Sequence, residues 1–249
     1  MEGYTIAEEY VLPSEGKIYN TKVNPNIRLR SMTTEEEMKR LSHSKSPFKL
    51  FSEIIDDCLL EQPGISSYDM CIGDYQYLMH KLRVVTYGSD YTVVVRCPKC
   101  GVENKHIIDL DSFSVVKYDE NTAPSLNITL PSSKKEVRLR IQTPRIIDWV
   151  TKKAEELDSK SKNSGQSVFL FTLMSMIEKV DGEVLDELKL EKFVRKLPMK
   201  DSNYILQYMK KFDFGLQTVF DCECTNPSCN HKYKSNTPIT GEFFGPEID

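Results

Sequence analysis

Cys97-Pro-Lys-Cys100-Gly101 is the first of two stretches that decide the predicted fold, and Cys224-Thr-Asn-Pro-Ser-Cys229 is the second. In the first stretch two thiolates lie on a tight turn, where Gly101 supplies the permissive backbone that lets amide groups point at sulfur. Each pair fills only half of a tetrahedral site. The sequence therefore predicts one structural zinc ion, Zn2+, held by the four thiolates across the whole fold.

At the second cysteine pair, the sequence offers more than one choice of metal ligands. Its cysteines are separated by four residues instead of two, a spacing that is less typical of zinc. Cys222 and His231 lie close by in the sequence, and either could replace a proposed ligand. A catalytic zinc would need an open position and a general base, but the chain has no His-Glu-x-x-His or His-x-Glu element. These features favour a structural metal in a protein that is not an enzyme.

Composition narrows the class of protein. The chain has 249 residues, enough for one large or two small domains with real cores. Its formal net charge of -4 argues against a main role in binding the phosphate backbone of nucleic acids. The longest apolar stretch, 168–177, is too short to span a bilayer, and the first residues lack the features of a signal peptide. We therefore expect no membrane span and synthesis in a reducing cytoplasm, with Cys58 and Cys71 as buried thiols.

Capping residues and apolar spacing predict the local structure of the first part of the chain. Threonine followed by glutamates is typical of a helix start, because the carboxylates favour the positive end of the helix dipole. Proline is favoured at the first helical position, and glycine just after the last. The predicted elements are a strand at 27–30, helices started by Thr33, Pro47 and Asp74, a helix end at Gly88, and strands at 91–95 and 102–110.

The same order of elements occurs twice in the sequence. Arg28-Leu-Arg is matched by Arg138-Leu-Arg, at an offset of 138 − 28 = 110 residues. Three further matches share an offset of 127, namely Asp74 with Asp201, Gly88 with Gly215 and Cys97 with Cys224. The difference of 17 residues would be an insertion in the second copy, which we place at the polar stretch 158–165. We interpret the pattern as an internal duplication in which each copy contributes one cysteine pair.

The predicted fold class is therefore α+β, with two internally related halves, each of strand, helices, strand and cysteine knuckle, clasped by one structural zinc. The predicted segments are an N-terminal extended arm (1–27), a first repeat with the first cysteine pair (28–118), a hairpin linker (119–137), a second repeat with the second pair (138–235) and a C-terminal tail (236–249).

Two apolar segments are candidates for burial in the fold or for docking to a partner protein. The helix predicted at 167–177 is apolar on nearly every side, which favours a buried central helix over a surface for a partner. The tail carries Phe243 and Phe244 next to each other. It is expected to fold back on the zinc region or to serve as a docking peptide for another subunit.

Several motifs together resemble a known family. They are Arg28-Leu-Arg-Ser-Met-Thr-Thr-Glu-Glu-Glu37, Asp74-x-x-Tyr-Leu, Tyr87-Gly88, Cys97-Pro-Lys-Cys100, Leu197-Pro-Met-Lys-Asp201 and Phe243-Phe244-Gly-Pro246. From about residue 10 to the end the chain is similar to the baseplate hub assembly family of T-even-type contractile-tailed phages. The resemblance implies an assembly chaperone or component of the tail hub that acts through contacts with other hub proteins, without catalysis. It also implies a location in the host cytoplasm during assembly or in the virion baseplate, and it leaves homo-oligomerisation open.

A zinc-ribbon module that binds nucleic acid is the alternative function. It would need a basic, aromatic-lined face near the cysteines. The candidates for such a face are Arg96, Lys99, Lys105, Lys232, Tyr233 and Lys234. The acidic balance of the chain makes this alternative the weaker of the two.

Overall fold

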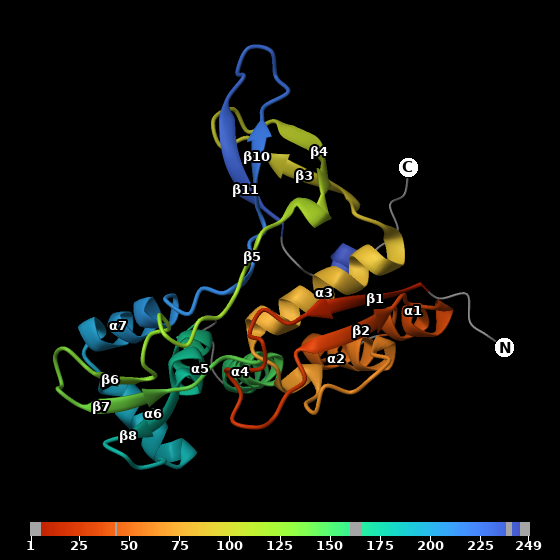
Figure 1. Cartoon of the computed structure of the whole chain (residues 1–249). Helices are drawn as coiled ribbons and strands as arrows, with labels where there is room; N and C mark the ends of the chain where they lie inside the picture. Colours follow the sequence, from red (N-terminus) through yellow and green to blue (C-terminus); the bar gives the residue numbers. More distant parts are fainter. Residues whose placement is uncertain (1–5, 43, 160–165, 238–240, 245–249) are drawn as a thin grey trace.

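The computed structural model describes residues 6–42, 44–159, 166–237 and 241–244 (Figure 1). The described part is α+β, as predicted, with seven α-helices and five small antiparallel sheets. No helix within it is long and apolar enough to cross a membrane.

The first half begins with a β-hairpin on which three helices pack. Thr33 caps the first of these helices, and the Glu36 carboxylate reaches back to the Thr33 backbone N–H at 2.7 Å. The predicted helix end at Gly88 is confirmed. The elements are β1 (Ala7–Val11), β2 (Asn26–Arg30), α1 (Thr34–Arg40), α2 (Pro47–Cys58), α3 (Ile72–Tyr87), β3 (Asp90–Arg96) and β4 (Glu103–Asp109), with short 3-10 turns at Ser67–Asp69 and Leu110–Ser112. The segment predicted as an arm thus pairs with β2 through β1.

The second half has a three-stranded sheet and four helices. Its elements are β6 (Asn127–Thr129), β7 (Glu136–Leu139), α4 (Pro144–Asp158), α5 (Gln166–Met176), β8 (Ile177–Val180), α6 (Glu187–Arg195), α7 (Met199–Met209), β10 (Val219–Glu223) and β11 (Lys232–Asn236). Two short strands, β5 (Val115–Val116) and β9 (Gly215–Leu216), pair with each other and tie the halves together. Gly73 lies against Phe214 so closely that an added Cβ would come within 2.8 Å of the Phe214 carbonyl oxygen.

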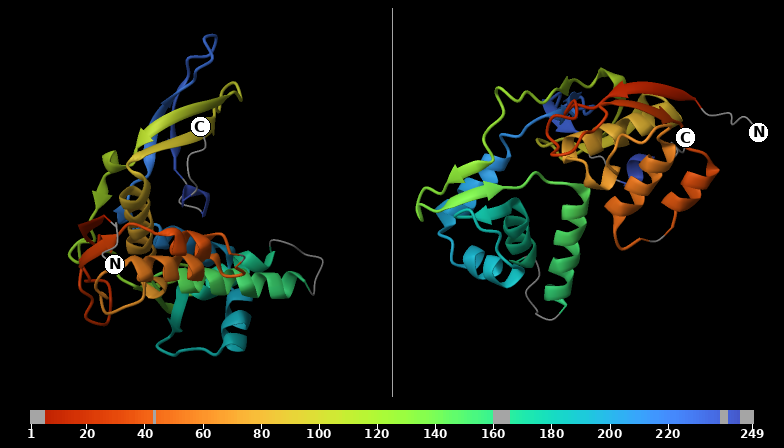
Figure 2. Two further views of the ribbon diagram at one scale, coloured as in Figure 1. Left: turned by 90° about the vertical axis from the view of Figure 1, so that its right-hand side faces the viewer. Right: turned by 60° about the horizontal axis from the view of Figure 1, so that its bottom comes forward.

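Each half has its own hydrophobic core. The first core lies between the β1–β2 hairpin, α2 and α3, and the second lies between the β6–β8 sheet and helices α4 to α7 (Figure 2). The predicted burial of the apolar helix is confirmed for one side of α5, which places Leu170, Leu173 and Met174 in the second core. Phe169, on the same helix, is 43 % exposed.

Asp74 does not cap its helix, and the prediction that it does is wrong. Helix α3 begins at Ile72, so that Asp74 is its third residue and is fully buried. The carboxylate accepts hydrogen bonds from the backbone N–H of Ser14 at 2.9 Å and from the hydroxyl groups of Ser14 and Tyr19. The side chain therefore ties the helix to the turn of the β1–β2 hairpin.

The second half contains the same kind of link between a buried aspartate on a helix and a hairpin turn. Asp201 is the third residue of α7, is fully buried, and accepts the backbone N–H groups of Ser132 and Ser133 at 2.7 and 2.8 Å. The two turns share the sequence Leu-Pro-Ser, at 12–14 and at 130–132. The turns therefore correspond at an offset of 132 − 14 = 118 residues.

A second pair of contacts also occurs in both halves, where the chain that follows a helix pairs with a strand. After α2 the chain pairs Leu59 with Leu29 of β2, and after α5 it pairs Ile177 with Leu139 of β7. The offset between Leu59 and Ile177 is again 118. If the halves are copies of one unit, 8 of the 17 extra residues fall between β7 and the end of α5, and 9 fall between β8 and α7, where α6 lies. The single insertion predicted at 158–165 stays a prediction, because residues 160–165 lie outside the described part.

The tail packs into the first core. Phe243 and Phe244, in a 3-10 turn at Gly241–Phe244, are both fully buried. The ring of Phe244 stacks on Phe51 of α2 with centroids 5.3 Å apart, and the ring of Phe243 meets Tyr91 at 5.0 Å. The sequence predicts a tail that folds back on the zinc region or serves as a docking peptide. These two residues do fold back, but into the first core, against α2, α3 and the start of β3, and not at the cysteines.

Candidate metal centre

Two β-hairpins, one from each half, bring the four predicted cysteines together. Cys97 and Cys100 lie in the turn between β3 and β4, and Cys224 and Cys229 lie between β10 and β11. The hairpins stand beside each other, apart from the two helical bodies (Figures 1 and 2). The Sγ atoms of Cys97 and Cys229 are 3.9 Å apart, and those of Cys100 and Cys224 are 3.5 Å apart.

These separations fit a tetrahedral metal site. All four sulfur atoms lie within 4.8 Å of one another. Four thiolates about 2.3 Å from one zinc would be about 3.8 Å from each other, whereas bonded sulfurs are about 2.05 Å apart. Among the described residues this is the only group of three or more His, Cys, Asp or Glu side chains close enough to hold a metal.

Backbone hydrogen bonds shape the first turn. The N–H of Cys97 donates to the carbonyl of Val102 at 2.9 Å, and the N–H of Gly101 donates to the carbonyl of Cys97 at 2.9 Å. Gly101 has a φ of 75°, in the left-handed region that glycine adopts without strain. The turn therefore needs glycine at the position where the sequence has it.

The second turn is closed in a similar way with a longer loop. The N–H of Cys224 donates to the carbonyl of His231 at 3.0 Å, and the N–H of Cys229 donates to the carbonyl of Asn226 at 2.9 Å. Cys222 lies on β10 opposite Tyr233. Neither Cys222 nor the His231 ring belongs to the group of four sulfurs.

Asn104 connects the two hairpins beside the cysteines. This residue of β4 is 1 % exposed. Its side-chain oxygen accepts the N–H and the hydroxyl of Thr225 at 2.7 and 2.8 Å, and its side-chain nitrogen donates to the Val102 carbonyl at 2.8 Å. Sequence reasoning missed Asn104, and its only signal was an asparagine within a strand, where that residue is depleted.

The thiols differ in their tendency to ionise. Burial alone would raise the pKa of Cys97, but the backbone N–H groups of Cys100 and Lys99 outweigh it and hold that pKa at about 7. Burial, together with hydrogen bonds to the other thiols, raises the pKa of Cys224 to about 12. Because four thiolates in one cluster repel each other, the fully ionised set requires a bound cation.

The basic residues near the cysteines are partly matched by acids. The Arg96 guanidinium pairs with Glu103 at 2.9 Å, and the Lys232 ammonium lies 3.9 Å from Glu223. Tyr233 stacks on His231, with ring centroids 6.0 Å apart. These contacts reduce the positive charge that the alternative, nucleic-acid-binding function would require.

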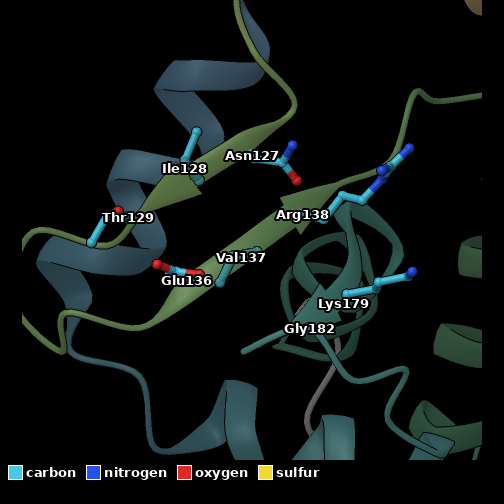
Figure 3. A pocket seen from close by; sticks show the side chains of 8 residues that line it. All are labelled: Asn127, Ile128, Thr129, Glu136, Val137, Arg138, Lys179 and Gly182. Atoms are coloured by element: carbon cyan, nitrogen blue, oxygen red, sulfur yellow. The ribbon is translucent and has the colours of Figure 1, made fainter.

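Two hollows lie beside the strands that open the two halves. One of about 380 Å3 lies over β6 and β7, where its lining includes Arg138 and Lys179 (Figure 3). The other, of about 550 Å3, lies over β1 and β2 and includes Arg28, the counterpart of Arg138. The residues that line the two hollows include no cysteine or histidine.

Comparison with known proteins places nearly the whole chain in one family. The family model described as "T4 bacteriophage base plate protein" matches residues 4–245. No curated protein and no solved structure matches the chain. The match spans both halves and both cysteine pairs.

Proposed function

The chain belongs to the T4 bacteriophage base plate protein family, and from this premise we propose that it serves the central hub of the tail baseplate, as an assembly chaperone or as a hub component. Family membership implies other baseplate proteins as partners and the virion tail baseplate as the location. The finer role rests on the motifs at 28–37, 97–100, 197–201 and 243–246. The protein acts by contacts in this proposal, in the host cytoplasm during assembly, and catalyses no reaction.

The proposed cofactor is one structural zinc ion bound by Cys97, Cys100, Cys224 and Cys229. The sulfur separations of 3.5 and 3.9 Å support it. Because each half supplies two ligands, the ion would hold the two hairpins, and the halves behind them, in one orientation. Zinc requires deprotonated thiols, so its binding would release the protons that the apo cluster retains.

The two halves are proposed to be copies of one unit. The ties from Asp74 and Asp201 support this, as do the matched pairings that follow α2 and α5. The sulfur contacts are also consistent with a twofold relation between the halves. If Cys97 exchanges with Cys224 and Cys100 with Cys229, the contact between Cys97 and Cys229 becomes the contact between Cys224 and Cys100. The zinc would then lie near a pseudo-twofold axis between the halves.

The match over residues 4–245 is the observation that carries the proposed function. It is tested by recovering the tagged chain from infected cells during tail assembly and identifying bound proteins by mass spectrometry. Stoichiometric recovery of hub proteins is expected. Recovery of baseplate proteins from outside the hub would contradict the hub role, and recovery of none would contradict the proposed function.

A zinc-ribbon nucleic-acid module remains the second candidate, because the two hairpins do bring four cysteines together. Its test is a gel shift with DNA and RNA over a range of salt concentrations. Binding that weakens steeply with salt would support the module. The ion pairs of Arg96 and Lys232 with acids lead us to expect no such binding.

A further inference from the structure

The first half shows how this fold receives a pair of aromatic side chains. Phe244 stacks on Phe51 of α2, while Phe243 stacks near His80 of α3 with ring centroids 6.2 Å apart. The Nε of Arg83, also on α3, donates to the Phe243 carbonyl at 3.0 Å. The binding site of the tail, here called its seat, therefore consists of an aromatic ring on α2 and two polar side chains on α3.

The second half has a counterpart for each member of this seat. The offset of 118 that relates the helices α2 and α5 assigns Phe169 to Phe51, since 169 − 51 = 118. The offset of 127 that relates α3 and α7 assigns Gln207 to His80 and Lys210 to Arg83. The aromatic residue is retained, and a cationic donor again occupies the position of the arginine.

The counterparts are open where the originals are covered. Phe51, His80 and Arg83 are 9 %, 1 % and 1 % exposed. Phe169 is 43 % exposed, and Gln207 and Lys210 are also exposed. Gln207 and Lys210 line a cavity of about 550 Å3 together with Met176 of α5 and with Ile72 and Gly73 of α3. Phe169 does not belong to this lining and lies two turns before Met176 on α5.

We propose that the exposed face of α5 at Phe169 and the exposed end of α7 at Gln207 and Lys210 bind a partner segment that carries two adjacent aromatic side chains. The chain's own tail is the template for this occupant, and because that tail is already seated in the first half, the segment comes from another protein. One ring covers Phe169, as Phe244 covers Phe51, and Lys210 donates to a backbone carbonyl, as Arg83 does. The proposal rests on the proposed function in two respects, the relation between the halves and the choice of a baseplate protein as the partner.

The test uses the full chain and a fluorescent peptide of residues 238–249 as a surrogate for the partner segment. Saturable binding is expected, with an increase in anisotropy. Removing the ring with Phe169→Ser should weaken it about tenfold or more, because the burial of one aromatic side chain is lost. Ile107→Ser, which changes an exposed apolar residue on β4, is the matched control and should bind the peptide as the unaltered chain does.

Methyl NMR of the methionines locates the bound peptide. Signals of Met176 and Met209, which line the cavity, should shift on binding, while the signal of Met79 in the first core stays in place. A shift at Met79 with none at Met176 would mean that the peptide displaces the chain's own tail, and it would overturn the proposal. Absence of binding at millimolar peptide, or equal binding by Phe169→Ser, would also overturn it. Zinc content and melting temperature, measured on the same samples, keep this outcome separate from the metal.

Discussion

Asp74 and Asp201 hold the same position in the two halves, as the third residue of α3 and of α7. Each is fully buried, and each accepts the backbone N–H of the serine in a Leu-Pro-Ser turn of the hairpin that opens its half. Such a tie fixes the hairpin relative to a helix distant in sequence. The same link between a helix and a hairpin turn therefore occurs in both halves, as the proposed duplication requires.

The first prediction is a pH-dependent loss of stability in Asp201→Asn. Burial would raise the pKa of Asp201, but the amides of Ser132 and Ser133 outweigh it and lower that pKa in the folded state. A lowered folded pKa stabilises the fold above the unfolded value of about 3.9, and the contribution is lost as the pH falls through the folded pKa. An asparagine NH2 would also face an N–H donor, so we expect a cost of about 2 kcal/mol at pH 7.

Urea denaturation at pH 7 and at pH 3 measures this effect. The difference between Asp201→Asn and the unaltered chain should shrink at the lower pH, because this carboxyl group is then largely protonated in the unfolded chain, whose pKa is about 3.9. Glu155→Gln, an exposed change on α4, is the control and should cost little at either pH. A cost for Asp201→Asn that is the same at both values would show that the carboxylate charge does not matter.

The second prediction concerns removal of the metal. Structural zinc contributes about 10–16 kcal/mol of binding free energy in small peptides, which is comparable with the stability of a whole domain. Chelation should therefore lower the melting temperature strongly, and Cys97→Ser and Cys224→Ser should do the same. Native mass spectrometry should find one zinc in the unaltered chain and none in these variants.

Cys222→Ala is the matched control for the metal, because Cys222 is buried in the same hairpin but lies outside the group of four sulfurs. It should keep one zinc and lose only the stability of a small core change. Loss of zinc from this variant would make Cys222 a ligand. An unchanged melt after verified metal removal would show that zinc does not hold the halves together.

The third prediction is that Asn104 supports the metal centre without binding the metal. Asn104→Ala removes both hydrogen bonds to Thr225 and leaves buried partners unsatisfied, so it should destabilise the fold by about 1–3 kcal/mol. Zinc affinity should fall by about 10- to 100-fold, as for other residues that position ligands. A chelator competition assay measures the affinity, and a double-mutant cycle with Thr225→Val should show strong coupling. Additive effects would mean that the two residues act independently.

How much could be predicted from the sequence depended on the range of the interactions. Thr33, Pro47 and Gly88 act on neighbouring backbone, and the structure confirms the helix boundaries that they predict. The cysteine spacing likewise identified the four side chains that meet. Asp74 was misassigned as a cap because its partner, Ser14, is 60 residues away. Phe243 was misplaced for the same reason, since apolar residues near a chain end do not specify which core they enter.

The last prediction compares equivalent phenylalanines of the two halves. Phe51→Ala should cost about 3–5 kcal/mol, because the ring is buried under Phe244 and its removal leaves a cavity. Phe169→Ala should cost only about 1 kcal/mol, because that ring is already 43 % exposed. Both changes place alanine in a helix, so helix propensity contributes equally, and urea denaturation of zinc-loaded protein measures the difference. Equal costs would mean that Phe169 is covered in solution, and its ring would then not be open to a partner segment.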